Sequence, residues 1–150
     1  MTSIVSYQKV ITPVTTHTLR VPDNIGVDDV TRCTELATLG DVTYVAVPAG
    51  VTLPAQPEQI SVSTVTLTDT LKEQIKAASP HVALIGERMV QKIRAKYTPE
   101  DEMYFARISI GALTGQYTFE TGEQEAVTAY GAHVESVRQW GRTEKAKLGL

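Results

Sequence analysis

The spacing of apolar residues changes near Asp69. Before it, apolar and polar residues alternate in short runs; after it, apolar residues recur every three or four positions. Alternation is the period of a strand with one covered face, and a spacing of three or four is that of a helix. The sequence therefore predicts an α+β protein, with a small antiparallel β part over residues 1–68 and a helical domain of three or four helices over residues 69–150.

The β part is divided by turn residues into several short strands. The strongest strand prediction is 42–47, where β-branched and aromatic residues dominate. It is expected to form a hairpin with 30–36 across a turn at 38–41. The remaining predictions are strands at 3–11 and 17–21, a last strand or an extended lead-in to the helices at 60–67, a turn cluster at Pro22, Asp23, Asn24 and Gly26, and a proline-rich connector at 48–59.

Each predicted helix begins at a start signal. A threonine or serine can cap the first turn, and a proline just inside it lacks an N–H that would have no partner there. Because the connections between helices are short, we expect antiparallel neighbours. The signals are Thr70 with Glu73 as a capping box, Ser79-Pro80, Thr98-Pro99 and Thr121-Gly122, the last opening a helix that runs toward Leu148.

Charge limits the classes of partner. The net charge is −3, and the first 68 residues carry three basic and six acidic side chains, whereas the rest is balanced. A nucleic-acid binder needs a basic face to neutralise phosphates, so no nucleic-acid partner is expected. No apolar run approaches the length of a membrane span, so no membrane partner is expected either.

Residues suited to catalysis or metal binding are few and scattered. The three histidines, His17, His81 and His133, lack the spacing of a zinc site, and Cys33 lies in a predicted strand. The acidic run 100–102 follows a helix start, where carboxylates favour the helix dipole. We therefore expect no catalytic residue, no metal and no cofactor, and we expect the chain not to be an enzyme.

Aromatic and basic residues mark candidate contact points. Trp140 lies at the edge of an apolar stripe on the last helix, and it is either an anchor onto the helical core or an interface hot spot. Tyr130 and Arg138 on the same helix, and Tyr44 with Val45 on the best strand, complete the predicted interaction residues.

One segment resembles a known group of proteins. The pattern Tyr130-x-x-x-Val134-Glu135-x-x-Arg138-x-Trp140-Gly141-Arg142, with Lys-Ala-Lys-Leu-Gly-Leu at 145–150, resembles the tail of small proteins encoded among tail-fibre, baseplate and tail-assembly genes of tailed bacteriophages and prophages. The 42–48 segment followed by Leu53-Pro54-x-Gln56-Pro57 is similar in style. The resemblance implies a role in the virion or in its assembly.

The expected function is that of a non-enzymatic phage structural or adaptor protein. Residues 1–68 are expected to be the β-rich interaction part, with the helical domain as the folded body. The chain would contact other tail, fibre or baseplate subunits as a homo- or hetero-oligomer, in the virion or in the host cytoplasm during assembly. The alternatives are a tail-fibre assembly factor (a chaperone) absent from the mature particle, a generic small interaction module, a small enzyme and a nucleic-acid regulator. The last lacks a basic face, and the enzyme lacks a catalytic set.

Overall fold

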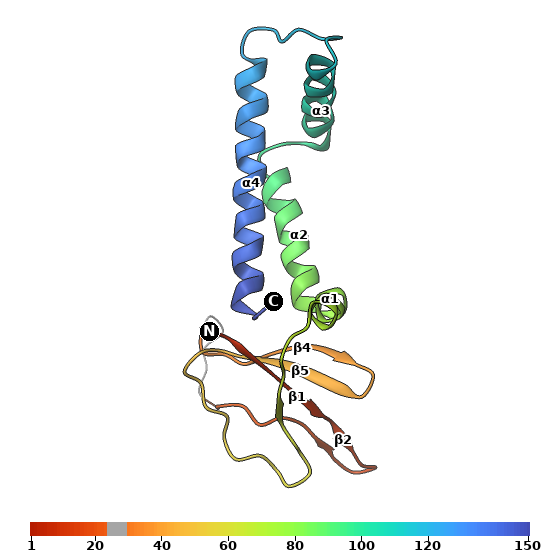
Figure 1. The fold of residues 1–150 in the computed structure, drawn as a ribbon, viewed down its shortest axis with the longest axis vertical. Coiled ribbons are helices and arrows are strands. Elements are labelled where there is room, and N and C mark those ends of the chain that lie inside the picture. The colour runs from red at the N-terminus through yellow and green to blue at the C-terminus, as the bar shows by residue number, and fades with distance from the viewer. Residues whose placement is uncertain (24–29) are drawn as a thin grey trace. The chain divides into compact units, whose positions relative to one another are not determined.

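The computed structural model describes residues 1–23 and 30–150, and strands precede helices along the chain (Figure 1). The fold is α+β, as predicted, and the change from strands to helices falls at Asp69. The strands are β1 (Ser3–Gln8), β2 (Val10–Ile11), β3 (Thr16–His17), β4 (Thr34–Leu39), β5 (Val42–Val47) and β6 (Ser63–Thr64). The helices are α1 (Asp69–Ala78), α2 (Pro80–Arg94), α3 (Pro99–Leu113) and α4 (Glu123–Lys147).

The chain forms two compact units that do not follow the order of the sequence. The sheet unit comprises Met1–Leu84 and Glu144–Leu150, and the helical unit comprises Ile85–Thr143. The unit boundaries therefore fall inside α2 and α4, whereas the change of secondary structure falls at Asp69. The helical unit is an insertion between two parts of the sheet unit.

The central sheet has the strand order β4-β5-β1-β6, and all its pairs are antiparallel. The predicted hairpin forms, but its first arm is Thr34–Leu39 and not 30–36. Gly40, with a φ of 60°, makes a tight turn that sets Leu39 opposite Val42. This register moves the first arm toward the turn.

Three other predicted strands are shorter than expected. The segment 3–11 is interrupted at Lys9, only Thr16–His17 pairs near the predicted 17–21, and only Ser63–Thr64 pairs within 60–67. Residues 48–59 contain no strand, as their prolines predict. Asn24 and Gly26 of the predicted turn cluster lie outside the described residues.

Both faces of the sheet are covered within the sheet unit. On one face Ile4, Leu36 and Ala46 pack with Ile75 of α1 and with Leu150. On the other face the buried cluster contains Val5, Tyr7, Leu19, Val45, Val47 and Ile60. The connector is fixed there by Gln56, whose amide accepts from the Arg20 N–H at 2.8 Å and donates to the Arg20 carbonyl at 2.9 Å. The Gln56 side chain thus forms with the backbone of Arg20 the two hydrogen bonds that a neighbouring strand would form.

The first helix belongs to the sheet unit. Its cap is Thr68, whose hydroxyl accepts from the Leu71 N–H at 3.2 Å, so the predicted Thr70–Glu73 capping box is wrong. The earlier start places Asp69 in the first turn, where its charge favours the helix dipole. Because Ile75 is fully buried against Ile4, Leu36 and Ala46, α1 covers one face of the sheet.

In the helical unit, α2 and α3 follow one another along α4. Contacts join Lys92 of α2 to Trp140 and, further on, Phe105 of α3 to Tyr130. The expected antiparallel packing holds for each of these helices against α4. It does not hold between α2 and α3, because the link at 95–98 continues in the same direction (Figure 1).

The start of α3 follows the prediction closely. Thr98 accepts from the Asp101 N–H at 3.1 Å, and the Asp101 carboxylate accepts from the Thr98 N–H at 2.8 Å. The hydrogen bond from the Thr98 N–H, and a second one from the Thr98 hydroxyl to the same carboxylate, hold the pKa of Asp101 below its usual value. Among the described residues, no helix is both long and apolar enough to cross a bilayer.

Candidate interaction surface

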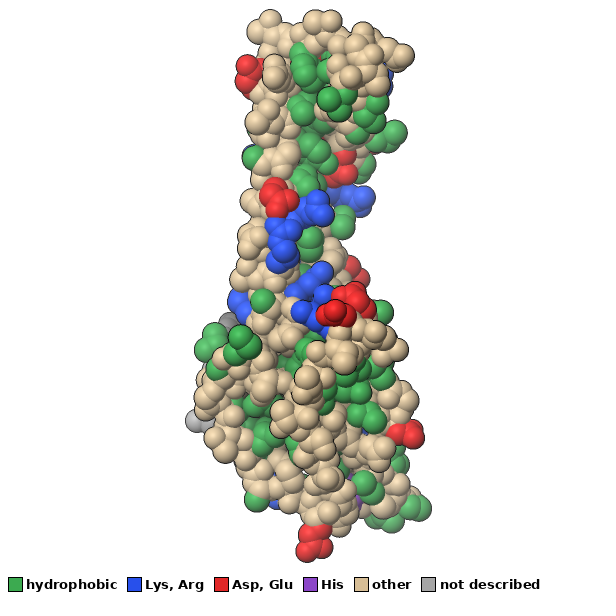
Figure 2. Space-filling model, viewed as in Figure 1, with side chains coloured by type: hydrophobic (Ala, Val, Ile, Leu, Met, Phe, Trp, Pro, Cys, Tyr) green, Lys and Arg blue, Asp and Glu red, His purple; other side chains and the backbone are tan. Residues whose placement is uncertain are grey.

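Helix α3 has apolar side chains on two opposite sides. Its inner side carries Ile108, which is 1% exposed, and the half-buried Phe105. On its outer side Met103 is 76% exposed, Ile110 62% and Leu113 88%. Figure 2 shows apolar atoms gathered over this part of the molecule. With the exposed Ala106 between them, Met103, Ile110 and Leu113 form what we call the outer α3 face.

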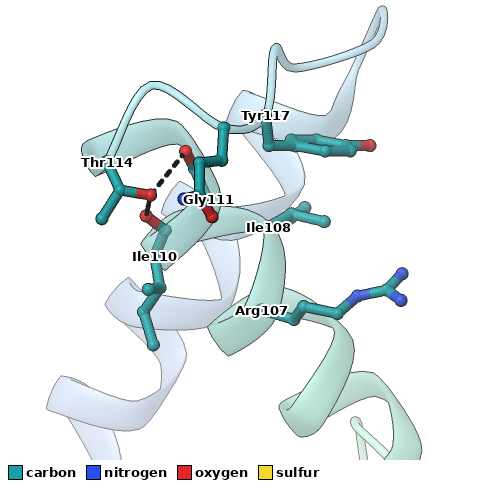
Figure 3. Close-up of a pocket in the computed structure, with 7 residues that line it drawn as sticks. Arg107, Ile108, Ile110, Gly111, Thr114 and Tyr117 are labelled. Carbon is teal, nitrogen blue, oxygen red and sulfur yellow. Dashed lines mark hydrogen bonds between the residues drawn. The ribbon is translucent and has the colours of Figure 1, made fainter.

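A cavity of about 500 Å³ borders the outer α3 face. Figure 3 shows that Ile110 and Thr114 lie on one side of the helix end, while Tyr117 and Arg107 extend to the other. The lining residues are Arg107, Ile108, Ile110, Gly111, Thr114, Gln116 and Tyr117. The cavity combines apolar walls with the Arg107 guanidinium and the hydroxyl groups of Thr114 and Tyr117.

Gly111 allows the chain leaving α3 to fold back against the helix. The Gly111 carbonyl accepts from the Gln116 N–H at 2.8 Å and from the Tyr117 N–H at 3.0 Å. A Cβ on Gly111 would lie 2.7 Å from the Cβ of Tyr117. The absence of a side chain at position 111 therefore positions Tyr117 beside the cavity.

The Glu123 carboxylate fixes the same end of the helical unit. It accepts hydrogen bonds from the hydroxyls of Tyr104 and Tyr117 and from the Glu120 N–H at 2.7 Å. These bonds, that of Tyr104 first, hold the pKa of Glu123 below its usual value. They raise the pKa of both tyrosines, because ionised tyrosine would face the carboxylate. This arrangement joins α3, the following loop and α4.

The predicted contact residues of α4 lie in different surroundings. Trp140 is half-buried, with the Lys92 ammonium 4.7 Å from its ring centroid. Tyr130 lies in an aromatic cluster, its ring centroid 5.1 Å from that of Tyr97, and Arg138 is exposed. Trp140 and Tyr130 thus both contact side chains of the helical unit, and their contact with a partner stays a prediction.

The predicted strand residues lie inside the sheet unit. Val45 is 3% exposed and belongs to the cluster with Val5 and Tyr7. Tyr44 is half-buried and packs on the other face of the sheet, against the cluster that contains Ile4 and Leu36. Their strand, β5, is paired on both sides, so it offers no edge. Among the described residues, β4 is the outer strand beside it, and its ladder is irregular between Glu35 and Ala37. An irregular edge discourages strand addition.

Cys33 and His81, which the sequence leaves far apart, line one cavity of about 360 Å³ with Arg32, Thr34 and Glu35. Burial raises the pKa of the Cys33 thiol. The thiolate needed for nucleophilic attack is therefore disfavoured. No group of three or more histidine, cysteine or acidic residues in residues 1–23 and 30–150 has the geometry of a metal site.

The outer α3 face was not anticipated from sequence, although its signal is present. Pro99, Met103, Ala106, Ile110 and Leu113 recur at intervals of four, three, four and three residues, with no charge among them. The inner residues Phe105 and Ile108 form a second stripe. The helix therefore carries an apolar stripe on each of two opposite sides, and only one of them is needed to pack against α4.

Comparison with known proteins gives no relative: no protein-family model, no curated protein and no solved structure matches this chain.

Proposed function

We propose that the chain is a non-enzymatic structural or adaptor subunit that acts through protein–protein contacts made by the outer α3 face. The observation that carries this proposal is the exposure of Met103, Ile110 and Leu113 on the side of α3 opposite its buried side. Large exposed apolar side chains in one patch are typical of an interaction surface. The neighbouring cavity supplies a recess for a partner side chain.

The setting we propose is the virion of a tailed bacteriophage, in its tail, fibre or baseplate region. Its support is the resemblance of the α4 segment around Trp140 to small phage-encoded tail proteins. Other subunits of the particle are the partners in this proposal. The capping box at Thr98 and the hydrogen bonds of Glu123 hold the two ends of α3 in place, as a contact surface requires.

The test is quantitative mass spectrometry of purified particles from cells that carry the gene. We expect the chain in a fixed ratio to the other structural proteins. Leu113→Glu should reduce its incorporation, whereas Val14→Glu, at an exposed position on another part of the chain, should not. Abundance in the lysate but absence from the particle would overturn the structural role and favour an assembly factor. Equal incorporation of both variants would overturn the role of the outer α3 face.

A further inference from the structure

We propose that the groove between α2 and α4 binds an acidic segment of a partner protein, with carboxylates beside the ammonium groups of Lys92 and Lys96 and an apolar side chain against Trp140. The groove shares no residue with the outer α3 face, so this proposal goes beyond the proposed function and does not depend on it. It follows from a cavity, from two lysines held on aromatic rings and from a local excess of positive charge.

A cavity of about 330 Å³ lies where the end of α2 passes α4. Its lining residues, which all belong to the helical unit, are Lys92, Ala95, His133, Ser136, Val137 and Trp140. Ala95, Val137 and Trp140 supply apolar surface, whereas Lys92 supplies a positive charge. A ligand that complements this lining therefore brings an apolar group together with a negative charge.

Aromatic rings position two lysine ammonium groups at this groove. The Lys92 Nζ lies 4.7 Å from the centroid of the Trp140 ring. The Lys96 Nζ lies 5.5 Å from the centroid of the Tyr97 ring. His133 contacts both pairs, because its ring is 5.6 Å from that of Tyr97 and its Nε2–H donates to the Lys92 carbonyl at 3.1 Å. Each ring restrains an ammonium group, so a carboxylate that binds there immobilises less than it would at a free lysine.

The positive charge of the groove is not neutralised by neighbouring carboxylates. Residues 85–96 and 131–143, which include the facing parts of α2 and α4, carry six basic side chains and two acidic ones, although the whole chain has a net charge of −3. One of the two acids, Glu135, is paired with Arg142. Within residues 1–23 and 30–150, no carboxylate forms an ion pair with Lys92 or Lys96. Figure 2 shows lysine and arginine side chains gathered at the level of α2. This charge attracts an anionic partner.

The short length of the basic stretch favours a protein segment over a nucleic acid. From Arg88 to Lys96 the stretch covers about 12 Å along the helix axis, at 1.5 Å per residue. Glu87 precedes it, and the acids at 100–102 follow it. A single-stranded nucleic acid follows a longer basic groove and stacks successive bases on aromatic rings, so its phosphates would meet these carboxylates. A short segment that combines carboxylates with an apolar side chain fits the length, the charge and the apolar lining.

The first experiment uses the fluorescence of Trp140, the only tryptophan of the chain. The full chain is titrated with a blocked peptide of alternating glutamate and leucine residues, and separately with the same peptide carrying glutamine in place of glutamate. At low salt we expect a saturable change in emission with the acidic peptide alone, and the affinity should fall as salt is added. Absence of saturable binding of the acidic peptide, both by fluorescence and by calorimetry, would overturn the proposal.

Two variants of α2 separate the groove from the charge of the helix as a whole. Lys92→Gln should weaken binding of the acidic peptide by about tenfold or more, because a hydrogen bond to a charged group is lost. Arg94→Gln is the matched control, since it removes the same charge but lies two residues further on, on the opposite side of the helix. Both side chains are exposed, so circular dichroism should show unchanged helix content. Equal weakening by the two variants would show that overall charge attracts the peptide and would contradict the proposal.

The second experiment locates the bound peptide and tests the class of ligand. Lysines are acetylated with and without the acidic peptide and quantified by mass spectrometry. We expect protection of Lys92 and Lys96 but not of Lys147, an exposed lysine of α4 outside the groove. Equal protection of all three lysines would contradict the proposal. Oligothymidylate that displaces the acidic peptide and binds more tightly would identify the occupant as a nucleic acid, and the proposal would then be wrong.

Discussion

Ile4 of β1 and Leu150, which follows α4, lie in one buried cluster under α1. The approach is reinforced by the Thr2 hydroxyl, which donates to the Lys147 carbonyl at 3.1 Å. Gly149, with a φ of 77°, turns the chain after α4. Its backbone lies against Ile4, because a Cβ added to Gly149 would be 3.5 Å from the Ile4 side chain. Residues 144–150 are therefore part of the sheet unit's core.

Leu150→Ala should destabilise the sheet unit by about 2–3 kcal/mol, because it removes a buried side chain and leaves a cavity. Urea denaturation followed by circular dichroism measures the free energy of unfolding. Val14→Ala, at an exposed position, is the control and should change it little. An equal effect of the two substitutions would show that Leu150 does not pack in the core.

Two glycines of α4 should respond differently to alanine. Gly131 has open space around its Cα, so Gly131→Ala should stabilise the helix by about 0.5–1 kcal/mol through helix propensity alone. At Gly141 a Cβ would overlap the Sδ of Met89 and lie 3.1 Å from its Cε. The flexible Met89 side chain would have to move to make room, so Gly141→Ala should stabilise the helix less than Gly131→Ala does.

The same pair of positions allows a coupling measurement. In a Met89→Ala background the obstruction at Gly141 is removed, so Gly141→Ala should stabilise the protein about as much as Gly131→Ala does. Thermal unfolding of the four proteins in this double-mutant cycle gives the coupling energy. Additive effects would mean that Met89 does not contact Gly141.

Ser79→Ala should raise stability by roughly 1 kcal/mol, because an unpaired buried hydroxyl is removed. Ser79 is 2% exposed and its Oγ has no hydrogen-bond partner among the described residues. Thr68→Ala is the contrasting variant. It removes the hydroxyl that caps α1 and should lower stability by about 1 kcal/mol. A loss of stability in both variants would show that Ser79 also acts as a cap.

Glu123 should make stability depend on pH in the acid range. Its pKa is lower in the folded chain than in the unfolded one, where it is about 4.3. Its stabilising contribution is therefore complete above the unfolded pKa and is lost as the pH falls through the folded pKa. Glu123→Gln should lower the melting temperature at pH 7 and flatten its fall as the pH drops below the unfolded pKa.

The neighbouring Glu125 provides the control for this pH dependence. It lies in the same first turn of α4 and is exposed. Glu125→Gln should keep the acid-range slope of the unaltered protein. If both glutamine variants retained that slope, the Tyr104 and Tyr117 hydroxyls would not stabilise the Glu123 carboxylate.

The elements that sequence predicts best are those whose signals are local. Pro80, Pro99 and the Thr98–Asp101 capping box begin helices where expected. The Thr68 cap was missed because Thr68 and Thr70 both stand before an apolar run, and the choice between them depends on how α1 meets the sheet. The start of β4 depends likewise on its register with β5, a non-local property.

The candidate surface was harder to predict than the elements. Trp140 and Tyr130 stand out in a sequence because aromatic residues dominate many interfaces, yet here they pack against Lys92 and Tyr97. The outer α3 face consists of aliphatic residues that look like core. Distinguishing it requires knowing which side of α3 meets α4, and only the tertiary contacts of Ile108 and Phe105 give that.

The discontinuous sheet unit has a consequence for biosynthesis. A ribosome makes residues 1–84 first, then all of residues 85–143, and only afterwards the segment 144–150 that carries Leu150. In the growing chain, the part of the sheet's apolar face that Leu150 covers therefore stays exposed until the whole inserted helical unit has been translated. During that interval we expect chaperones that recognise exposed apolar surface to bind this face of the growing chain.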